Sequence, residues 1–504
     1  MLKKLRIQNF KVWKDTGEID LAPITLFFGA NSSGKSSIGQ FLMMLKQTIE
    51  SPAQTAVFYS GERNSAVQLG SYEEMVFGRK PKGININFKY QWSRNSSRAT
   101  SYDHLHKMSS YNDLAFQAEI VPQGETQYTT NLKSAPETSY LPVTRGFKYT
   151  LFKNGEIQCS LGMKRKPHTS SKYEIESSNF KLEKQKSEQE DVNLGTPVHF
   201  YGFPPEVFTA YANIYDFVTG VHYLHEELFR DLFYLSPLRV KADRSSYYYT
   251  DPESVGYQGE DTVAAIVAAR DREIVLPPIE KIQKRSFEEV IAYELQKMGL
   301  IEQFRVQQIT KQVYGVQIRT KGSKTWVELP DVGFGISQVL PVLVQCFYAP
   351  EGSIILIDQP EVHLHPYAQA ALADVMIDVI NSRLIFEKTY EERFGTQVKR
   401  SLRTDYKKRN IQLIIETHSE HFLRRLQRRI AEGRLSEDKV SAYFANINAP
   451  PAKLERLKID EFGNIQNWPE NFFGDEMGDI LEQAKAATKK RRQQNIQGYG
   501  ETNE

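Results

Sequence analysis

The chain has 504 residues, of which 40% are hydrophobic and 25% are charged, and its formal net charge is +2. This length predicts more than one domain, and the near-neutral balance names no strongly acidic or basic partner. The two cysteines, Cys159 and Cys346, lie too far apart to indicate a disulfide framework or a zinc site. No apolar run approaches the roughly 18–20 residues of a membrane span, and the N-terminus lacks the apolar core of a signal peptide. We therefore expect a cytoplasmic protein.

The first segments of the chain predict paired strands, a loop and a helix. Leu2–Phe10 and Gly17–Leu21 have the pattern of partner strands, and Ile24–Phe28 is a short apolar run. The run breaks at Gly29, and helical spacing follows from Ile38 to Ile49. A strand, a glycine-containing loop and a helix in this order form the context that a phosphate-binding loop requires.

The loop itself fits the pattern G-x-x-x-x-G-K-[ST]. Its glycines let successive backbone N–H groups point at a phosphate. We expect Lys35 to reach the β- and γ-phosphate oxygens and Ser36 to ligate Mg²⁺, while the following helix presents the positive end of its dipole. The predicted nucleotide-binding residues are Gly29, Asn31, Ser32, Ser33, Gly34, Lys35, Ser36 and Ser37.

The middle of the chain has a different character. Between Trp92 and Gly195, Ser, Thr, Asn and Lys dominate, and short alternating segments predict a β-rich lobe. Alternation is clearest at Ile84–Tyr90, Ala115–Ile120, Phe147–Phe152 and Tyr173–Leu182. Helical spacing then predicts helices within Pro204–Phe233, Glu260–Arg270 and Ile279–Lys297, with a strand at Phe233–Leu238.

The C-terminal half alternates strands with helices. Arg305–Thr320 and Thr325–Leu329 alternate in the manner of strands. The expected elements that follow are a helix at Ser337–Tyr348, a strand at Ser353–Ile357, a helix from Tyr367 to about Phe386, a strand at Ile411–Ile415 and a helix at Glu420–Glu432. This order predicts a parallel sheet that helices cover on both faces.

Further segments carry residues suited to phosphate chemistry. Asp358 ends the apolar strand at Ser353–Ile357, where a carboxylate can hold the Mg²⁺ that bridges nucleotide phosphates. Gly333 and Gly335 open a helix whose free N–H groups could bind an anion, although an ordinary glycine turn has the same pattern. His418 follows the last predicted strand. A lone histidine is more often structural, but its order after the Asp358 strand favours a γ-phosphate contact.

Taken together, these segments resemble the ATP-binding-cassette superfamily, in the branch of cohesin-like (SMC), recombination-repair (RecF) and overcoming-lysogenization-defect-type ATPases. LKKLRIQNFKVWKD resembles the first strand of that branch, VGFGISQVLP its signature segment, DQPEVHLHP its Walker B and D-loop region, and ETHSEHFL its switch histidine. LGSYEEMVFG and YLSPLRVKADR match more weakly. DEFGNIQNWPENFFG is similar to the small C-terminal domain of unknown function found in compact bacterial ATPases of anti-phage defence.

This resemblance implies a fold and an assembly. The fold is an α/β, P-loop NTPase (ABC-type) core with a mixed β-sheet and helices, plus a β-rich and helical insertion lobe. ATP and Mg²⁺ would lie on Lys35 and Asp358 of one protomer, covered by Gly335, Ser337 and Gln338 of a second. The implied domains are an N-terminal ATPase part (1–90), a β-rich insertion (91–200), a helical lobe (201–304), a C-terminal ATPase part (305–448) and a small domain with a basic tail (449–504).

The sequence departs from the family pattern at two positions. Most of the superfamily has a Glu after the metal-binding Asp, to polarise the attacking water, whereas this chain has Gln359. An amide cannot accept a proton but can orient water, so either Gln359 positions the water or Glu361 is the base, with His418 as the switch. Turnover is expected to be slow. Ile336 also stands where the signature segment usually has a small residue.

Clusters of basic residues raise the question of nucleic-acid binding. One cluster precedes the His418 strand, one lies on the helix that follows it, and one marks the tail: Lys399, Arg400, Arg403, Lys407, Lys408, Arg409; Arg424, Arg425, Arg428, Arg429; Lys489, Lys490, Arg491, Arg492. A solvated charged face is the favoured interpretation, and contact with nucleic acid is the alternative.

We expect an ATPase that dimerises around ATP and acts as a nucleotide-driven switch. The resemblance implies bacterial anti-phage defence with a separate effector such as a nuclease. Two alternatives are a DNA-stimulated repair-type ATPase and a weakly hydrolysing, nucleotide-gated scaffold. A transporter motor is a further possibility, but the LKKLRIQNF strand and the large middle insertion argue against it.

Overall fold

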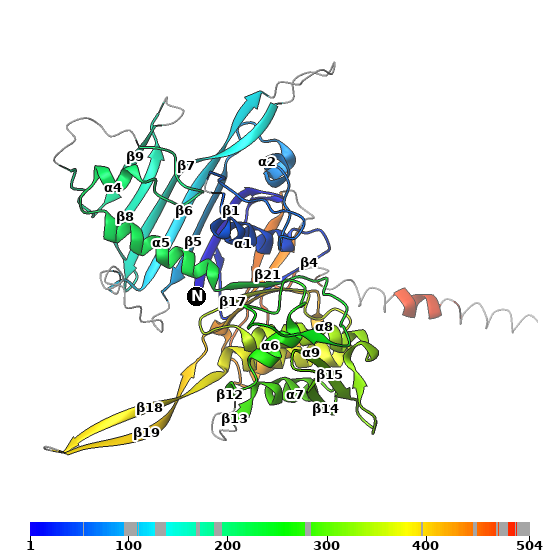
Figure 1. Ribbon diagram of the computed structural model, residues 1–504. Coiled ribbons are helices and arrows are strands. Elements are labelled where there is room, and N and C mark those ends of the chain that lie inside the picture. Colours follow the sequence, from blue (N-terminus) through cyan, green and yellow to red (C-terminus); the bar gives the residue numbers. More distant parts are fainter. Residues whose placement is uncertain are drawn as a thin grey trace, which may run out of the picture.

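The computed structural model describes residues 1–53, 55–94, 108, 110–126, 138–167, 172–185, 194–277, 284–394, 397–446, 451–469, 472, 482–488 and 490. For residues 125–126, 138–139, 386–394 and 397–404 it describes the backbone alone. The described chain forms two large sheets with helices packed on them, and a long hairpin projects from one side (Figure 1).

The central element is a six-stranded sheet with the order β10-β17-β20-β4-β21-β22. Its strands are parallel, except that β22 runs antiparallel to β21. Their bounds are β10 Leu232–Leu235, β17 Ile354–Asp358, β20 Gln412–Glu416, β4 Ile24–Gly29, β21 Val440–Asn446 and β22 Lys453–Leu457. The central strands are buried along their length because helices cover both faces, which confirms the predicted parallel sheet.

Alternation along the strands divides their side chains between two hydrophobic cores. On one face, Leu26, Ile355 and Leu413 pack with helices α8 (Phe334–Tyr348), α9 (Pro366–Asn381), α10 (Glu420–Ala431), α6 (Thr262–Ala268) and α7 (Phe287–Lys297). On the other face, Phe27 and Leu356 pack with α1 (Lys35–Glu50) and α5 (Tyr215–Arg230).

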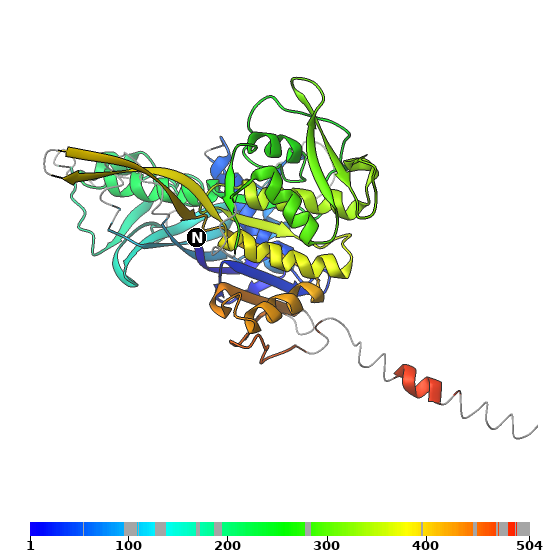
Figure 2. The same cartoon turned by 90° about the horizontal axis from the view of Figure 1, so that it is seen from below.

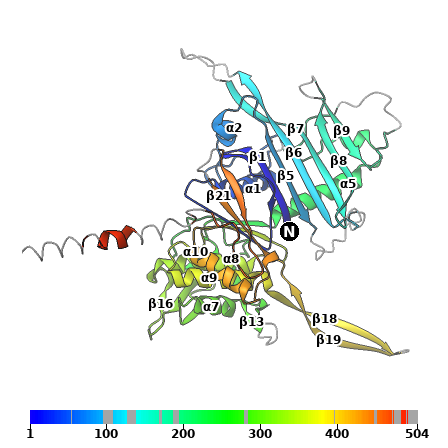
Figure 3. The ribbon, with the colours of Figure 1, turned by 180° about the vertical axis from the view of Figure 1, so that it is seen from behind.

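The second core also serves an eight-stranded antiparallel sheet, with the order β2-β1-β5-β6-β7-β8-β9 and β3 paired to β1. The bounds are β1 Leu2–Phe10, β2 Trp13–Asp15, β3 Ile19–Asp20, β5 Ile86–Ser93, β6 Asp113–Thr126, β7 Thr138–Lys153, β8 Glu156–Arg165 and β9 Tyr173–Ser178. Helix α5 lies across one face of this sheet, next to the short α4 (Glu206–Ala210) (Figures 1 and 3).

These sheets cross the domain limits that the sequence suggests. The limit between residues 90 and 91 falls within β5, so the expected insertion and the first strand β1 share one sheet. The expected helical lobe 201–304 is divided in space. Helix α5 packs in the core of the antiparallel sheet, whereas α6 and α7 pack in the core below the parallel sheet.

Two small sheets complete the described chain. One contains β11 (Ser246–Tyr247), β14 (Gln303–Gln308), β15 (Val313–Arg319) and β16 (Val327–Glu328). The other contains β12 (Glu273–Val275), β13 (Lys284–Ser286), β18 (Arg383–Phe394) and β19 (Gln397–Lys408). The hairpin β18–β19 extends well beyond the body of the molecule (Figures 1 and 2).

Three predicted helix limits are wrong. The helix from Tyr367 ends at Asn381, because Arg383 and Leu384 leave it to pair with β12. The helix predicted from Ile279 begins at Phe287, where Ser286 and Glu289 form a capping box. Helix α8 begins at Phe334, ahead of the expected Ser337. Among the described helices, none is both long and apolar enough to cross a membrane.

Short elements connect these parts. The segment Leu69–Gly78 that the resemblance covers contains helix α2 (Tyr72–Met75) and the start of the 3-10 turn Phe77–Arg79. Further 3-10 turns lie at Leu329–Asp331, directly before the start of α8, and at Glu437–Lys439, before β21.

Candidate functional site

The candidate site lies at the carboxyl ends of three neighbouring parallel strands. Strand β20 pairs with both β17 and β4, and Glu416 is the register partner of Asp358 on one side and of Phe27 on the other. The loop after β4, the turn after β17 and the turn after β20 therefore begin side by side. Ligands of open α/β sheets bind at this edge, and the strand register brings the segments that carry Lys35, Asp358 and His418 to it.

The loop after β4 has the backbone shape that its glycines permit. Gly29 has φ 142° and Gly34 has φ 91°, conformations that side chains disfavour. A Cβ at Gly34 would lie 2.2 Å from Cγ2 of Val12, and one at Gly29 would lie 2.6 Å from the Ala445 oxygen. The indole N–H of Trp13 donates to the Gly34 oxygen at 3.1 Å, so β2 fixes the loop from outside.

Lys35 is buried at the centre of this loop, with 4% of its surface exposed. Its Nζ donates to the oxygens of Gly29 at 3.0 Å and Ala30 at 2.8 Å, and lies 3.8 Å from Oε1 of Glu416. Burial lowers the pKa of Lys35, and the charges of Glu416 and Asp358 oppose that change. The ammonium group thus lies between the loop and the acidic strand ends.

The remaining loop residues differ in what they face. Asn31 and Ser32 are exposed, and Ser32 has φ 59°. Ser33 is buried, and its Oγ accepts from Nζ of Lys35 at 3.5 Å. Ser37 turns inward, where its Oγ donates to the Gly34 oxygen at 2.5 Å. The Ser36 hydroxyl is close enough to the Glu416 carboxyl to oppose the rise in its pKa.

Asp358 and Glu416 form a buried acidic pair. Oδ2 of Asp358 accepts from the Tyr234 hydroxyl at 2.9 Å, and its main-chain oxygen accepts from Nη2 of Arg239 at 3.0 Å. Burial and then the charge of Glu416 raise the pKa of Asp358 to about 7, and burial also raises that of Glu416. Oε2 of Glu416 is buried without a hydrogen-bond partner among the described residues.

This donor set fits a hard divalent cation. Magnesium prefers oxygen ligands, and it is usually held by one or two carboxylates together with substrate phosphates. Asp358, the Ser36 hydroxyl and the unpartnered oxygen of Glu416 meet that description. No cluster of three or more His, Cys, Asp or Glu suited to metal binding occurs in the described part of the chain, so a bound Mg²⁺ would need the phosphates as further ligands.

The turn after Asp358 contains both candidates for positioning water. Gln359 has φ 46°, and its N–H donates to the Glu416 oxygen at 2.8 Å. A positive φ in a residue with a side chain stores strain that is common at functional sites. Glu361, three residues after Asp358, keeps Oε2 buried without a partner among the described residues.

His418 is tied to that same turn. Its main-chain N–H donates to Oε1 of Glu361 at 2.7 Å, while its ring is exposed. Partial desolvation and the charge of Lys35 lower the pKa of His418. The neutral imidazole therefore lies near Lys35, at the edge of the loop.

The start of α8 lies apart from the loop around Lys35. A Cβ at Gly335 would lie 2.8 Å from the His363 oxygen, so the helix packs closely on the turn after β17. Ser337 Oγ donates to the Phe334 oxygen at 3.0 Å, and Gln338 is buried. Within the described chain, no hydrogen bond or ion pair joins Gly335, Ser337 or Gln338 to the loop around Lys35.

Sequence reasoning missed three residues of this site. Glu416 follows the apolar strand Ile411–Ile415 as Asp358 follows its own strand, and this position was the signal that could have identified it. Tyr234 and Arg239 come from β10 and the loop after it, and they reach Asp358 because β10 pairs in parallel with β17. The signal was the segment YLSPLR, which the resemblance covered weakly.

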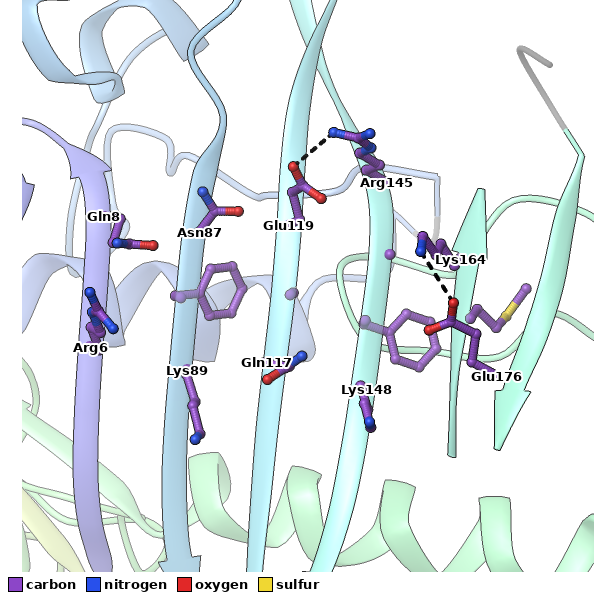
Figure 4. A pocket seen from close by; sticks show the side chains of 15 residues that line it. Arg6, Gln8, Asn87, Lys89, Gln117, Glu119, Arg145, Lys148, Lys164 and Glu176 are labelled. Carbon is purple, nitrogen blue, oxygen red and sulfur yellow. Dashed lines mark hydrogen bonds and ion pairs between the residues drawn. The ribbon is translucent and has the colours of Figure 1, made fainter. Parts of the chain in front are cut away.

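Two hollows lie on the surface near these elements. One of about 700 Å³ borders the phosphate loop at Ser32 and is lined by Lys11, Val12, Phe77 and Arg79, among others. Another of about 400 Å³ lies on the outer face of the antiparallel sheet (Figure 4). Two of its cations are paired, in Arg145–Glu119 at 3.1 Å and Lys164–Glu176 at 3.3 Å, while Arg6, Lys89 and Lys148 add positive charge to the lining.

The basic clusters are largely neutralised or buried. Arg425 and Arg429 both bind Asp374, while Arg424 pairs with Glu420 and Arg428 with Glu432. Lys407 pairs with Glu351 at 2.8 Å, and Arg409 is 1% exposed. These pairings support the solvated face over contact with nucleic acid. Lys489, Arg491 and Arg492 lie outside the described residues, as do the side chains of Lys399, Arg400 and Arg403.

Solved structures with a similar fold include heads of SMC proteins. An SMC head bound to the C-terminal winged-helix domain of ScpA has 10% identity and a TM-score of 0.40, covering 91% of this chain and 98% of that chain. The SMC head domain from Thermotoga maritima has 10% identity, a TM-score of 0.36, and coverage of 91% and 99%. A Pyrococcus furiosus SMC head bound to the C-terminal domain of ScpA has 11% identity, a TM-score of 0.41, and coverage of 96% and 99%. These similarities are too weak to indicate a function, which is inferred from the geometry of the site instead.

Family models match most of the chain. No curated protein sequence matches it, but residues 1–203 match a model described as "AAA ATPase domain". Residues 219–424 match "AAA domain, putative AbiEii toxin, Type IV TA system", and residues 435–483 match "Protein of unknown function (DUF3696)". The first match contains the loop around Lys35 and the second contains Asp358 and His418. The chain is an AAA-type ATPase with a P-loop core of α/β fold.

Proposed function

We propose that the chain binds ATP and Mg²⁺ at the joined ends of β4, β17 and β20, and that a second copy completes the site through the start of α8. The observation that carries this proposal is the set of contacts among Lys35, Asp358 and Glu416 at the mouth of a glycine loop. Lys35 and the loop N–H groups would hold the phosphates, while Asp358 and Ser36 would hold Mg²⁺.

For hydrolysis we favour Glu361 over Gln359 as the group that accepts the proton of water. The water oxygen would attack the γ-phosphorus, its proton would pass to Glu361, and the bond to the β-phosphate oxygen would break to give ADP and phosphate. The support for this assignment is that Glu361 is a carboxylate with a buried, unpartnered oxygen, whereas Gln359 is an amide whose N–H donates to the Glu416 main-chain oxygen.

The hollow beside Ser32 is where the nucleoside would extend. It opens next to the exposed part of the loop and combines apolar Val12 and Phe77 with cationic Lys11 and Arg79. Mixed apolar and polar linings of this kind suit a flat base with a charged tail.

The first prediction concerns Lys35. Replacing Lys35 with Ala removes the ammonium from the phosphate loop, so ATP affinity should fall at least about a hundredfold, because charge-assisted contacts to phosphate are strong. A fluorescent ATP analogue titrated against both proteins measures the change. As a matched control, Lys46→Ala on the same helix should leave affinity unchanged, because Nζ of Lys46 binds the Phe229 oxygen and Glu50 instead. Equal affinity in K35A and the parent refutes the assignment.

We propose that ATP binding and hydrolysis drive a switch in anti-phage defence, with an effector such as a nuclease supplied by another protein. The matches to AAA-type models support the ATPase part of this proposal. Turnover measured with and without DNA tests the alternatives. Strong stimulation by DNA favours a repair-type ATPase, and binding with negligible turnover favours a nucleotide-gated scaffold.

A further inference from the structure

Arg239 is an arginine buried behind the candidate site. It lies in the loop after β10, is 8% exposed, and donates through Nη2 to the main-chain oxygen of Asp358 at 3.0 Å. Among the described residues, its Nε and Nη1 are buried and have no hydrogen-bond partner. A buried charge with unused N–H groups is costly, and such a group calls for an explanation beyond packing.

The backbone around Arg239 is fixed on both sides. The Ser236 N–H donates to the Tyr257 oxygen at 2.8 Å, and the Val240 N–H donates to the Gln258 oxygen at 3.0 Å. Within the loop, Ser236 Oγ donates to the Leu238 oxygen at 2.9 Å. Because the loop is anchored in this way, the guanidinium is directed inward and is not free to swing into solvent.

Glu361 is the buried carboxylate whose charge is opposite to that of Arg239. This carboxylate is 7% exposed, its Oε1 accepts the His418 N–H, and its Oε2 has no partner within the described chain. Its charge is the largest attractive influence on Arg239, ahead of that of Asp358, although burial still lowers the pKa of Arg239 to about 10. The buried cation and the buried anion thus attract one another but form no direct ion pair among the described residues, and each has hydrogen-bonding capacity to spare.

We propose that Arg239 is a positioning residue for ATP hydrolysis, which holds the Asp358–Glu361 turn by its main-chain oxygen and orients the Glu361 carboxylate through Nε or Nη1. This inference rests on the proposed function. When a nucleotide binds, the Asp358–Glu361 turn brings Glu361 into contact with Arg239. The plane of the Glu361 carboxylate is then oriented to accept the proton of the attacking water. Misplacing a reacting group by about 1 Å costs roughly a hundredfold in rate.

Steady-state turnover and nucleotide affinity of Arg239→Gln test this role. Turnover at saturating ATP should fall by about a hundredfold, while the affinity for a fluorescent ATP analogue changes by no more than about threefold, since uniform binding is kept. Arg239→Lys retains the charge and loses the planar fork, so it should recover part of the lost turnover. Parental turnover in R239Q, or a loss confined to affinity, overturns the inference.

A double-mutant cycle with Glu361→Gln measures the coupling between Arg239 and Glu361. Residues that act as a unit show non-additive losses, so Arg239→Gln should cause little further loss of turnover in the E361Q background. Independent, additive losses contradict a role through Glu361.

A second buried arginine provides the control for effects on folding. Arg409 also donates to a main-chain oxygen, that of Ala349 at 2.7 Å, but lies away from the site. Arg409→Gln should lower the melting temperature and leave turnover per folded molecule unchanged. If R239Q fails to fold, R239K carries the test, and full turnover in R239K then overturns the inference. A parent chain that binds no nucleotide refutes the proposed function instead.

Discussion

Two glycines near the start of α1 show how differently one residue type can be constrained. Gly34 has φ 91°, and a Cβ there would meet Val12 at 2.2 Å, whereas Gly39 lies within the helix with open space around its Cβ position. The first glycine is required by the loop, and the second is a weak point in the helix. The same substitution should therefore have opposite effects at the two positions.

We predict that Gly34→Ala abolishes ATP binding and lowers stability, because the loop must move to admit the methyl group. Gly39→Ala should raise the free energy of unfolding by up to about 1 kcal/mol through helix propensity and leave ATP affinity intact. Urea unfolding and a nucleotide titration on both variants measure this. Retained ATP binding in G34A contradicts the account of the loop.

At the scale of elements, α5 carries a histidine that ties it to the antiparallel sheet. His225 is fully buried, and its ring nitrogens meet the hydroxyls of Tyr90 on β5 and Tyr149 on β7, the latter at 2.6 Å. Burial lowers the pKa of His225 well below its ordinary value. The folded state therefore holds the ring neutral, while the unfolded chain takes up a proton below its ordinary pKa of about 6.5.

This linkage sets the direction of a pH effect. The stability from neutral His225 is complete above about pH 6.5 and falls as the pH drops below that value. His225→Gln should lower the unfolding free energy at neutral pH by about 1–3 kcal/mol, as for a broken buried network, and should flatten the acid slope. Urea unfolding across pH measures both quantities. The exposed His421→Gln is the control, and an equal slope in H225Q and the parent would contradict the linkage.

Elements with strong local signals could be predicted from the sequence. The apolar runs of β4, β17 and β20 and the motif around Lys35 were located closely, because burial on both faces leaves a continuous hydrophobic stretch. The hairpin β18–β19 was missed, because Leu384–Phe386 reads as a continuing helix until its pairing with β12 is known. Strand β8 was also missed, although Ile157, Cys159, Leu161 and Met163 alternate along it and it pairs with β7, its neighbour in the sequence.

The site residues also divide into those with a local sequence signal and those without one. Lys35 and Asp358 belong to motifs that carry their own chemistry, so spacing alone identified them. Arg239 reaches Asp358 through a strand pairing between β10 and β17 that brings distant segments together. A contact set by sheet order leaves no periodic trace in the sequence, and it could not be predicted from local pattern.

At the scale of the whole molecule, the start of α8 is the feature that calls for a second copy. Phe334 is 66% exposed beside the turn after β17, and Ser337 makes its described hydrogen bond to Phe334 within its own helix. A helix N-terminus with exposed N–H groups can bind phosphate, and in the proposed assembly that phosphate belongs to the nucleotide of the other protomer. Each site would then combine Lys35 of one chain with Gly335 of its partner.

Mixing two inactive variants tests this claim most directly. Lys35→Ala removes the phosphate loop contact and Ser337→Arg blocks the start of α8, so each protein alone should lack ATP turnover. In a dimer of one chain of each kind, one of the two shared sites combines an intact loop with an intact helix start. The account predicts that turnover reappears on mixing, at about a quarter of the parental value for random pairing of a two-fold assembly. Turnover that stays at the level of the separate variants would contradict a site shared between protomers.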